Sequence, residues 1–377
     1  MPDNVLVPSI PASRAAHRAS LAGAAWLGGA HLVVDAVSVT SVLRAAPARG
    51  AVATSALLFV IAYDVLAFAG QVPLGWLVDR LALRRGAALI GIVLTAAAMA
   101  IGGRAGYAVV LLAGLGNALF HLGAGAMVLA GGREKAAPAG VFVGPGALGL
   151  GIGLLLGRRF VEIPLWPWLF ALAAAVAVVL LVATRPQACS EPVPAPEFRL
   201  GTLLAIATLF GLSVAVRSLV GTVGCDACDK TLFLAVAVPC AGCAGKLIGG
   251  FLADRFGWIE LSMVALLAAA PLLAFSGGDL WLALPGFFLF QMTMPVTLVA
   301  VFRLMPDRPA LAFGLPCLAL IAGALPAYLP DVWRPRDGSV FVLVLGSAAV
   351  LFWGLRRLAS QTSRFFPLGR RASKGSP

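Results

Sequence analysis

The sequence predicts an all-α polytopic membrane protein with twelve transmembrane helices, arranged as two parallel six-helix repeats. The first observation is composition: 60% of the residues are hydrophobic, 12% are charged, and the mean hydropathy is +0.97. The second is that apolar runs of about 20 residues, long enough to cross a bilayer as a helix, recur along the whole chain. Because these runs are continuous rather than alternating, they exclude a membrane β-barrel. The third is a polar turn that occurs once in each half of the chain.

Each predicted span is an apolar run that ends at a short polar loop. The twelve ranges are 21–43, 51–76, 86–102, 105–131, 136–157, 164–184, 200–223, 230–252, 258–276, 280–303, 308–330 and 339–356. An even number puts both termini on one side of the membrane. With the termini in the cytoplasm, that side holds eighteen lysines and arginines and the other side eight, which predicts an N-in, C-in topology.

The charge and the N-terminus restrict location and partners. The net charge of +12 lies in loops between spans and in the C-terminal tail, so it indicates orientation in the lipid bilayer rather than nucleic-acid binding. The first apolar run is too long for the core of a cleavable signal, and we expect a multi-pass protein of the cytoplasmic (inner) membrane.

The domain boundaries follow from a proline-rich segment between the sixth and seventh spans. Residues 185–199 read RPQACSEPVPAPEFR, which predicts an extended cytoplasmic linker. Residues 1–184 would then form one six-helix bundle, and residues 200–377 a second bundle with a basic tail. We expect the protein to function as a monomer.

The repeated polar turn supports this division. Gly75 to Arg85 reads GWLVDRLALRR, and Gly249 to Trp258 reads GGFLADRFGW. Their acids, Asp79 and Asp254, occupy the same place in the two halves of the chain. The sequence LFH that ends at His121 in the fourth span has a similar counterpart, LFQ, in the tenth span. Parallel repeats of six spans are one of the plans on which transporters are built.

At these residues the chain resembles the major facilitator superfamily, whose loop between the second and third helices reads roughly G-x-L-A-D-R-x-G-R-K/R. The first copy matches at Gly75, Leu77, Asp79, Arg80 and Arg84, and the second at Gly250, Leu252, Ala253, Asp254, Arg255 and Gly257. The resemblance implies that each acid pairs with helix ends and bases across the two halves and locks the cytoplasmic gate of the outward-facing state. The alternative is a solvated turn that caps the second helix.

The fifth span contains a second motif of small residues. It reads GVFVGPGALGLGIG and resembles the antiporter signature of the same superfamily at Gly140, Gly144, Pro145 and Gly149. Small residues at helical spacing let two helices approach closely, and the proline bends the helix. The resemblance implies an exporter, whereas the physics alone requires only tight packing.

A narrower resemblance, to fosmidomycin-resistance-type exporters and their uncharacterised relatives, rests on the first and fourth spans. The first span contains AHLVVD, with His31 and Asp35 four residues apart, and the fourth contains GNALFHLGAG, from Gly116 to Gly125. Residues four apart lie on one helix face, and an imidazole beside a carboxylate can share a proton. We therefore predict proton coupling at His31 and Asp35, with His121 joining them. Static hydrogen bonding is the alternative.

Other polar residues within spans are candidates for substrate binding, because charged and polar groups are costly inside a membrane. Arg217 has no acid near it in sequence before Asp226, and a guanidinium binds carboxylate or phosphate with two hydrogen bonds. Asn117 and Gln291 are further candidates as cavity-lining hydrogen-bonding groups. The alternative for Arg217 is that it reaches the external surface. Lys246 is expected to reach the cytoplasmic surface.

The cysteines do not predict a metal site. Cys225 and Cys228 would lie at an outer helix end, and Cys240 and Cys243 within a helix about 18 Å away at 1.5 Å per residue. One tetrahedral site cannot join pairs so far apart. Whether Cys225 and Cys228 have a metal or redox role is left open by the sequence.

The expected function is secondary active transport by alternating access, with a small molecule and protons as partners, no cofactor and no metal. The chain has no nucleotide-binding loop and no hydrolase or metalloprotease motif, so we do not expect an enzyme. Proton-coupled efflux is the first expectation. The alternatives are uptake of a nutrient or metal complex, and a non-transporting scaffold or sensor with the same fold.

Overall fold

The computed structural model describes residues 14–46, 53–102, 106–132, 135–159, 164–184, 198–228, 231–328 and 335–362. Within these ranges the chain is helical. The helices are α1 (Arg14–Ala45), α2 (Ala53–Asp64), the π-helical segment η1 (Val65–Ala69), α3 (Gln71–Arg80), α4 (Arg84–Ile101), α5 (Tyr107–Gly131), α6 (Ala136–Arg159), α7 (Leu165–Thr184), α8 (Leu200–Cys228), α9 (Leu232–Phe256), α10 (Trp258–Ala274), α11 (Leu280–Gln291), α12 (Met294–Leu304), α13 (Pro309–Tyr328) and α14 (Asp337–Thr362).

These segments make the twelve predicted spans. The second span consists of α2, η1 and α3 in sequence, and the tenth consists of α11 and α12. Eleven stretches are long and apolar enough to cross a membrane, and the shorter apolar helix α10, Trp258–Ala274, accounts for the twelfth. Large apolar side chains remain exposed on the outside, among them Trp281 at 88% and Phe170 at 70%. That distribution fits a surface in contact with lipid.

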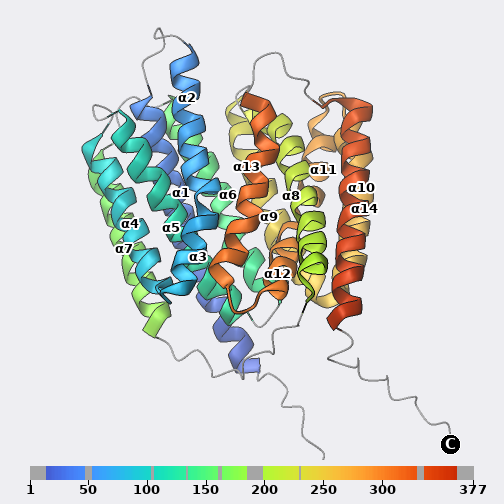
Figure 1. Cartoon of the computed structure of the whole chain (residues 1–377). Helices are drawn as coiled ribbons and strands as arrows, with labels where there is room; N and C mark the ends of the chain where they lie inside the picture. The colour runs from blue at the N-terminus through green and yellow to red at the C-terminus, as the bar shows by residue number, and fades with distance from the viewer. Residues whose placement is uncertain are drawn as a thin grey trace, which may run out of the picture.

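The two halves lie side by side, with α1 to α7 on the left and α8 to α14 on the right of Figure 1. Helix α1 begins and α14 ends at the lower end of this view, so the two ends of the helical part are on one side (Figure 1). This arrangement confirms the predicted architecture of two six-helix bundles. The linker assigned to residues 185–199 remains a prediction, because residues 185–197 lie outside the described ranges.

Two spans are interrupted, and the tenth has a clear chemical cause. Pro295 lies at the start of α12 and has no N–H to bond the carbonyl of Gln291 four residues earlier. The chain therefore makes a turn at Met292 and Thr293 before α12 begins. In the second span, the π-helical segment η1 begins directly after Asp64. From the sequence we predicted each of these spans as one uninterrupted range, 51–76 and 280–303.

Backbone contacts join the halves at glycines, in two related places. A Cβ on Gly75 of α3 would lie 2.9 Å from the carbonyl oxygen of Ala310 in α13. A Cβ on Gly250 of α9 would lie 2.7 Å from the carbonyl oxygen of Ala136 in α6. Both glycines occupy the same position in the repeated turn. Any side chain there would force the halves apart. Close packing of the two halves therefore requires glycine at both positions.

Candidate functional site

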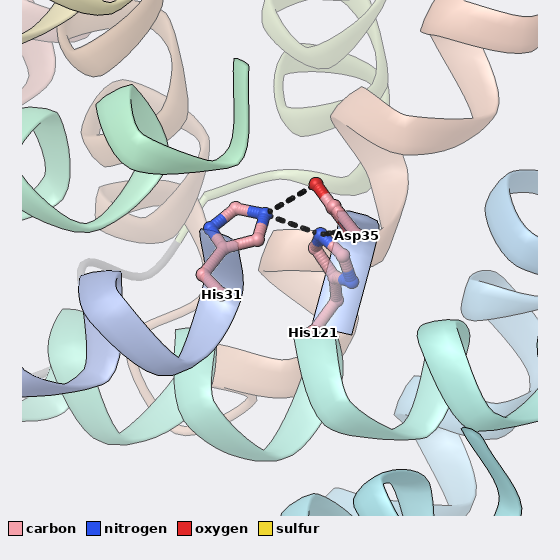
Figure 2. Close-up of side chains that lie close together, drawn as sticks. All are labelled: His31, Asp35 and His121. Atoms are coloured by element: carbon pink, nitrogen blue, oxygen red, sulfur yellow. Dashed lines mark hydrogen bonds and ion pairs between the residues drawn. The ribbon is translucent and has the colours of Figure 1, made fainter. Parts of the chain in front are cut away.

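Three ionisable side chains meet inside the first half. His31 and Asp35 lie on α1, and the Nε2 atom of His31 is 3.1 Å from an Asp35 carboxylate oxygen. His121 comes from α5, and its Nε2 atom is 2.7 Å from that of His31 and 3.6 Å from Asp35 (Figure 2). His31 and His121 are 4% and 6% exposed. The structure thus brings together all three residues that the sequence indicated for proton coupling.

The hydrogen bonds on the far sides of the two rings determine their tautomers. His31 Nδ1 is 2.9 Å from the carbonyl oxygen of Phe142, and His121 Nδ1 is 2.8 Å from that of Asn117. A carbonyl oxygen only accepts, so both Nδ1 atoms carry hydrogen. If both rings were neutral, two Nε2 lone pairs would face each other at hydrogen-bond distance. The contact therefore requires one additional proton between the rings, and Asp35 supplies the balancing negative charge.

Neighbouring groups hold the three side chains in place. Asn117, predicted to bind substrate, donates from Nδ2 to Asp35 Oδ1 at 2.7 Å, so in this structure it positions the carboxylate. The ring of Phe142 lies 4.7 Å from that of His31 between centroids. Gly146 of α6 is directly behind His31, because a Cβ at that position would overlap the imidazole ring. Together these contacts fix the geometry of a cluster whose two imidazoles are buried and whose Asp35 side chain is 15% exposed.

The same three residues are the one group of potential metal ligands found in the described part of the chain, with ligand atoms within 4.8 Å of one another. The distance between the two nitrogens separates a metal from a proton. Two imidazoles on one zinc ion, at about 2.0–2.1 Å each in a tetrahedral site, have nitrogens about 3.3 Å apart. The observed 2.7 Å is a hydrogen-bond distance. This geometry fits a shared proton and not a metal ion.

A second polar group lies in the other half. Arg217 of α8 is 3% exposed and donates to Thr293 Oγ1 at 2.6 Å, at the turn between α11 and α12. It also approaches Thr297 Oγ1 at 3.5 Å and Met294 Sδ at 3.3 Å. The alternative that it reaches the external surface therefore does not describe this structure. Gln291, partly buried, ends α11 beside this turn.

Lys246 also belongs to this interior. Its side chain is partly buried, and its electrostatic neighbours are Cys243, Asp35 and Arg217. We expected Lys246 to reach the cytoplasmic surface, and that prediction is wrong. Its short distance from the polar turn would allow that, but the face of α9 that carries Lys246 packs against α6. A carbon on Gly140 would overlap the Lys246 carbonyl oxygen, so the lysine lies along the boundary between the halves.

The repeated turn places its two acids on helix ends of the opposite half. Asp79 accepts from the backbone N–H of Ala310 at 3.1 Å and of Leu311 at 2.8 Å, in the first turn of α13. Asp254 accepts from Ala136 and Ala137 at 2.8 and 2.9 Å, in the first turn of α6. First-turn amides have no partner within their own helix, and the helix N-terminus favours negative charge. Each carboxylate therefore caps a helix of the other half.

The basic residues of the turn act differently from what the resemblance implied. Arg80 lies over the ring of Trp76 at 5.0 Å, and Arg255 over that of Phe256 at 5.3 Å. Arg84 begins α4. Among the residues that the structure describes, neither Asp79 nor Asp254 forms an ion pair with a base. The connection across the halves is made by carboxylates and backbone amides.

The small residues of the fifth span pack in two directions. Gly140 and Gly144 face α9 of the other half, and a Cβ on Gly144 would lie 3.1 Å from the Cys243 carbonyl oxygen. A Cβ on Gly149 would overlap the backbone of Leu32 in α1. Pro145 lies inside α6. The motif thus holds α6 between the proton cluster and the second half.

One polar contact across the halves has no signal in the sequence. Tyr328, near the end of α13, donates a hydrogen bond to Asp64 at the end of α2. A tyrosine at a span end is ordinary in membrane proteins, so its position alone does not indicate a partner. The side chains of Cys225 and Cys228 lie outside the described part, so their role stays open.

Comparison with known proteins concerns the fold. No family model and no curated protein matches the chain. Solved structures do: a point variant of the E. coli fucose:proton symporter FucP has a TM-score of 0.63 at 13% identity, covering 90% of this chain and 98% of that one. FucP in the outward conformation has a TM-score of 0.65 at 13% identity and the same coverage. The human organic anion transporter MFSD10 (TETRAN) has a TM-score of 0.61 at 16% identity, covering 92% and 98%. The chain therefore has the major facilitator fold.

Proposed function

We propose that this protein is a secondary active transporter of the cytoplasmic membrane that moves a small molecule by alternating access. The proposal proceeds from the fold, in which two six-helix bundles meet at a central boundary. It is supported by the carboxylates of Asp79 and Asp254, which hold the two halves together through backbone amides of α13 and α6. Four such hydrogen bonds can break and re-form as the halves move, whereas a permanent interface would be apolar and continuous.

The observation that carries the proposal furthest is the close approach of the His31 and His121 Nε2 atoms. Their 2.7 Å contact needs one added proton, and Asp35 balances its charge. A group of this kind drives transport only if its proton is bound more tightly in one state than in the other. Lys246 supplies that difference, because it belongs to the second half and interacts with Asp35. Movement of the halves changes the distance between this cation and the cluster.

In this state the positive charge of the lysine weakens the binding of the proton that His31 and His121 share, because it favours the negatively charged, deprotonated cluster. When the halves separate at Lys246, that preference is lost and the cluster binds a proton more readily. The acidic turns would then be released, and access would change from one side of the membrane to the other. We assign the state described here to the outward-facing side of the cycle. One of the similar structures, FucP, is also in an outward conformation.

For the direction we propose export, supported by the likeness of Gly140, Gly144, Pro145 and Gly149 to an antiporter signature. Proton-coupled uptake of a nutrient or metal complex is the second candidate. It is favoured by the position of Lys246, because a substrate anion that neutralises this lysine would help a proton to bind beside Asp35, and the two would then cross together. A scaffold that does not transport would have no need of a desolvated proton site, which is costly inside a membrane.

The test begins with a thermal-shift screen of purified protein against a compound library at two pH values, because a ligand that binds the folded protein raises its melting temperature. A ligand found in this way is then assayed for proton-coupled flux in proteoliposomes. We expect Asp35→Asn to abolish the coupled flux while the protein still folds and still binds the ligand. Asp279→Asn, which changes a helix cap outside the cluster, is the matched control. Undiminished coupled flux in Asp35→Asn would remove the cluster from the mechanism.

A further inference from the structure

Two basic residues stand apart from all others in the chain. Of its 28 lysines and arginines, 26 are at or beyond the predicted span ends, and Arg217 and Lys246 are the two that remain. Both belong to the second half. A buried cation must be compensated, since removing it from water costs several kcal/mol or more. The groups that balance the charges of Arg217 and Lys246 therefore indicate what these two residues bind.

Arg217 is not compensated by an acid. Its hydrogen bonds go to two threonine hydroxyls and approach a methionine sulfur, all of them uncharged. Its Nε atom is buried and has no partner within the described part of the chain. Arg217 as a whole is 3% exposed, so its guanidinium has an unused donor that is shielded from water. Arginine in this condition is a receptor for an oxyanion, which takes two hydrogen bonds from one guanidinium.

Lys246 adds a second positive charge inside the second half, on the part of α9 that packs against α6. It interacts with Arg217, and no ion pair or hydrogen bond of its ammonium group exists among the described residues. Its counterpart in the first half is Gln71, which has the same position relative to Gly75 as Lys246 has relative to Gly250. A carbon on Gly314 would contact the Gln71 carbonyl just as one on Gly140 would contact that of Lys246. The first half makes the same packing contact with a neutral glutamine. The positive charge of Lys246 is therefore not needed for packing, and we look for another role for it.

We propose that Arg217 and Lys246 together bind a small oxyanion, a carboxylate or phosphate-type group, as the charged part of the transported substrate. This inference rests on the proposed transport function and names its substrate class. Thr293, which accepts from Arg217, lies in the turn between α11 and α12. Half-helices that begin at such a break direct their positive ends at substrate anions in other transporters. Gln291 at this break is the neutral hydrogen-bonding group of the site.

The position of Lys246 gives the sign of coupling. Among the described residues, the titratable groups that interact with Asp35 are His31, His121, Tyr63, Lys246 and Cys317, and Asn117 is its neutral hydrogen-bond donor. Lysine is the one among them that carries a positive charge from the second half. A bound anion neutralises it and so removes the charge that opposes a proton on the His31–His121 pair. Anion and proton therefore bind more tightly together than alone, and by linkage each raises the affinity of the other equally.

The experiment measures binding of defined probes to the purified full-length protein in detergent. Inorganic phosphate and benzoate are titrated at pH 6 and pH 8, with benzamide as the neutral analogue of benzoate. We expect one or both anions to bind and benzamide not to bind, with tighter anion binding at pH 6. Lys246→Gln, which installs the residue of the other half, should weaken binding about ten- to a hundredfold, as for a hydrogen bond to a charged group. Lys246→Arg should restore most of it.

Arg357→Gln removes one charge from the exposed face of α14 and is the control for net charge. Equal binding by Lys246→Gln and the wild type, or no binding of either anion by the wild type, overturns the inference. These results would leave proton-coupled transport of an uncharged substrate intact. Anion binding that depends on Lys246 in a protein without any coupled flux would instead uphold the site and contradict the transport function. The two proposals can therefore fail separately.

Discussion

The Nε2 atoms of His31 and His121 lie 2.7 Å apart, although the two residues belong to different helices and are 90 positions apart in the chain. Each ring donates from its Nδ1 atom to a backbone carbonyl, so neither can turn its Nε2 lone pair away without losing a buried hydrogen bond. The pair is thus built to hold one proton. With no proton on either Nε2 atom, two lone pairs would face each other. With a proton on both Nε2 atoms, two N–H groups would face each other.

This arrangement predicts a specific nuclear magnetic resonance signature. The chain has three histidines, so His17→Gln in protein labelled with ¹⁵N-histidine leaves only the pair. Both Nδ1 atoms should be protonated, and a single proton should be shared between the two Nε2 atoms, with coupling across the hydrogen bond. Asp35→Asn should remove the shared proton because the balancing charge is lost. Spectra in which either Nδ1 is unprotonated would contradict the assignment.

Gly146 provides a test that changes no charge. A methyl group at this position overlaps the His31 ring, so Gly146→Ala should displace the imidazole and break the contact with His121. We expect a loss of stability of about 1–3 kcal/mol from overpacking, despite the better helix propensity of alanine. Gly29→Ala in α1, where nothing lies within 4 Å, is the control and should be neutral or slightly stabilising. Thermal unfolding and the shared-proton signal are the measurements, and an unchanged signal in Gly146→Ala would argue against this packing.

The contact between Asp79 and α13 predicts local changes in amide exchange. Asp79→Asn keeps the shape of the side chain but turns one acceptor into a donor, so one of the bonds to Ala310 and Leu311 is lost. At about 1.5–3 kcal/mol for a hydrogen bond to a charged group, exchange at the start of α13 should become about ten- to a hundredfold faster. Hydrogen–deuterium exchange with mass spectrometry measures this.

The reciprocal variant is Asp254→Asn, which should act on the start of α6 and leave α13 unchanged. Asp279→Asn alters a cap made within one half, to Trp281, and should affect neither place. If all three variants exchange like the wild type at α6 and α13, the carboxylates do not hold the halves together.

We expect the buried charge of Arg217 to lower the free energy of unfolding of the protein. Arg217→Met replaces an uncompensated buried cation by an apolar side chain of similar length. The hydroxyls of Thr293 and Thr297 that it contacts keep their hydrogen bonds to the carbonyls of Phe290 and Thr293. We expect a melting temperature equal to or above that of the wild type, since such replacements are neutral or stabilising by about 1–4 kcal/mol. A large drop in melting temperature would mean that the guanidinium is structural and not reserved for a ligand.

The predictable part of the site was the part that local spacing controls. His31 and Asp35 are four residues apart on one helix, so their proximity follows from the helix itself. Lys246 could not be placed in the same way. Its distance from the polar turn fits either the cytoplasmic surface or the boundary between halves, and only the contact of α9 with α6 decides between them.

By itself, the sequence determined that this is a membrane protein of twelve spans in two repeats, because a bilayer requires long apolar helices and because a duplicated turn persists in the chain. The tertiary structure alone decided what those turns and polar residues contact. The partner of Asp79 is a backbone amide 231 residues away, and amides carry no sequence signal. The pairing of His121 with His31 depends likewise on where α5 crosses α1. Contacts of this kind are set by how helices pack, which no single helix encodes.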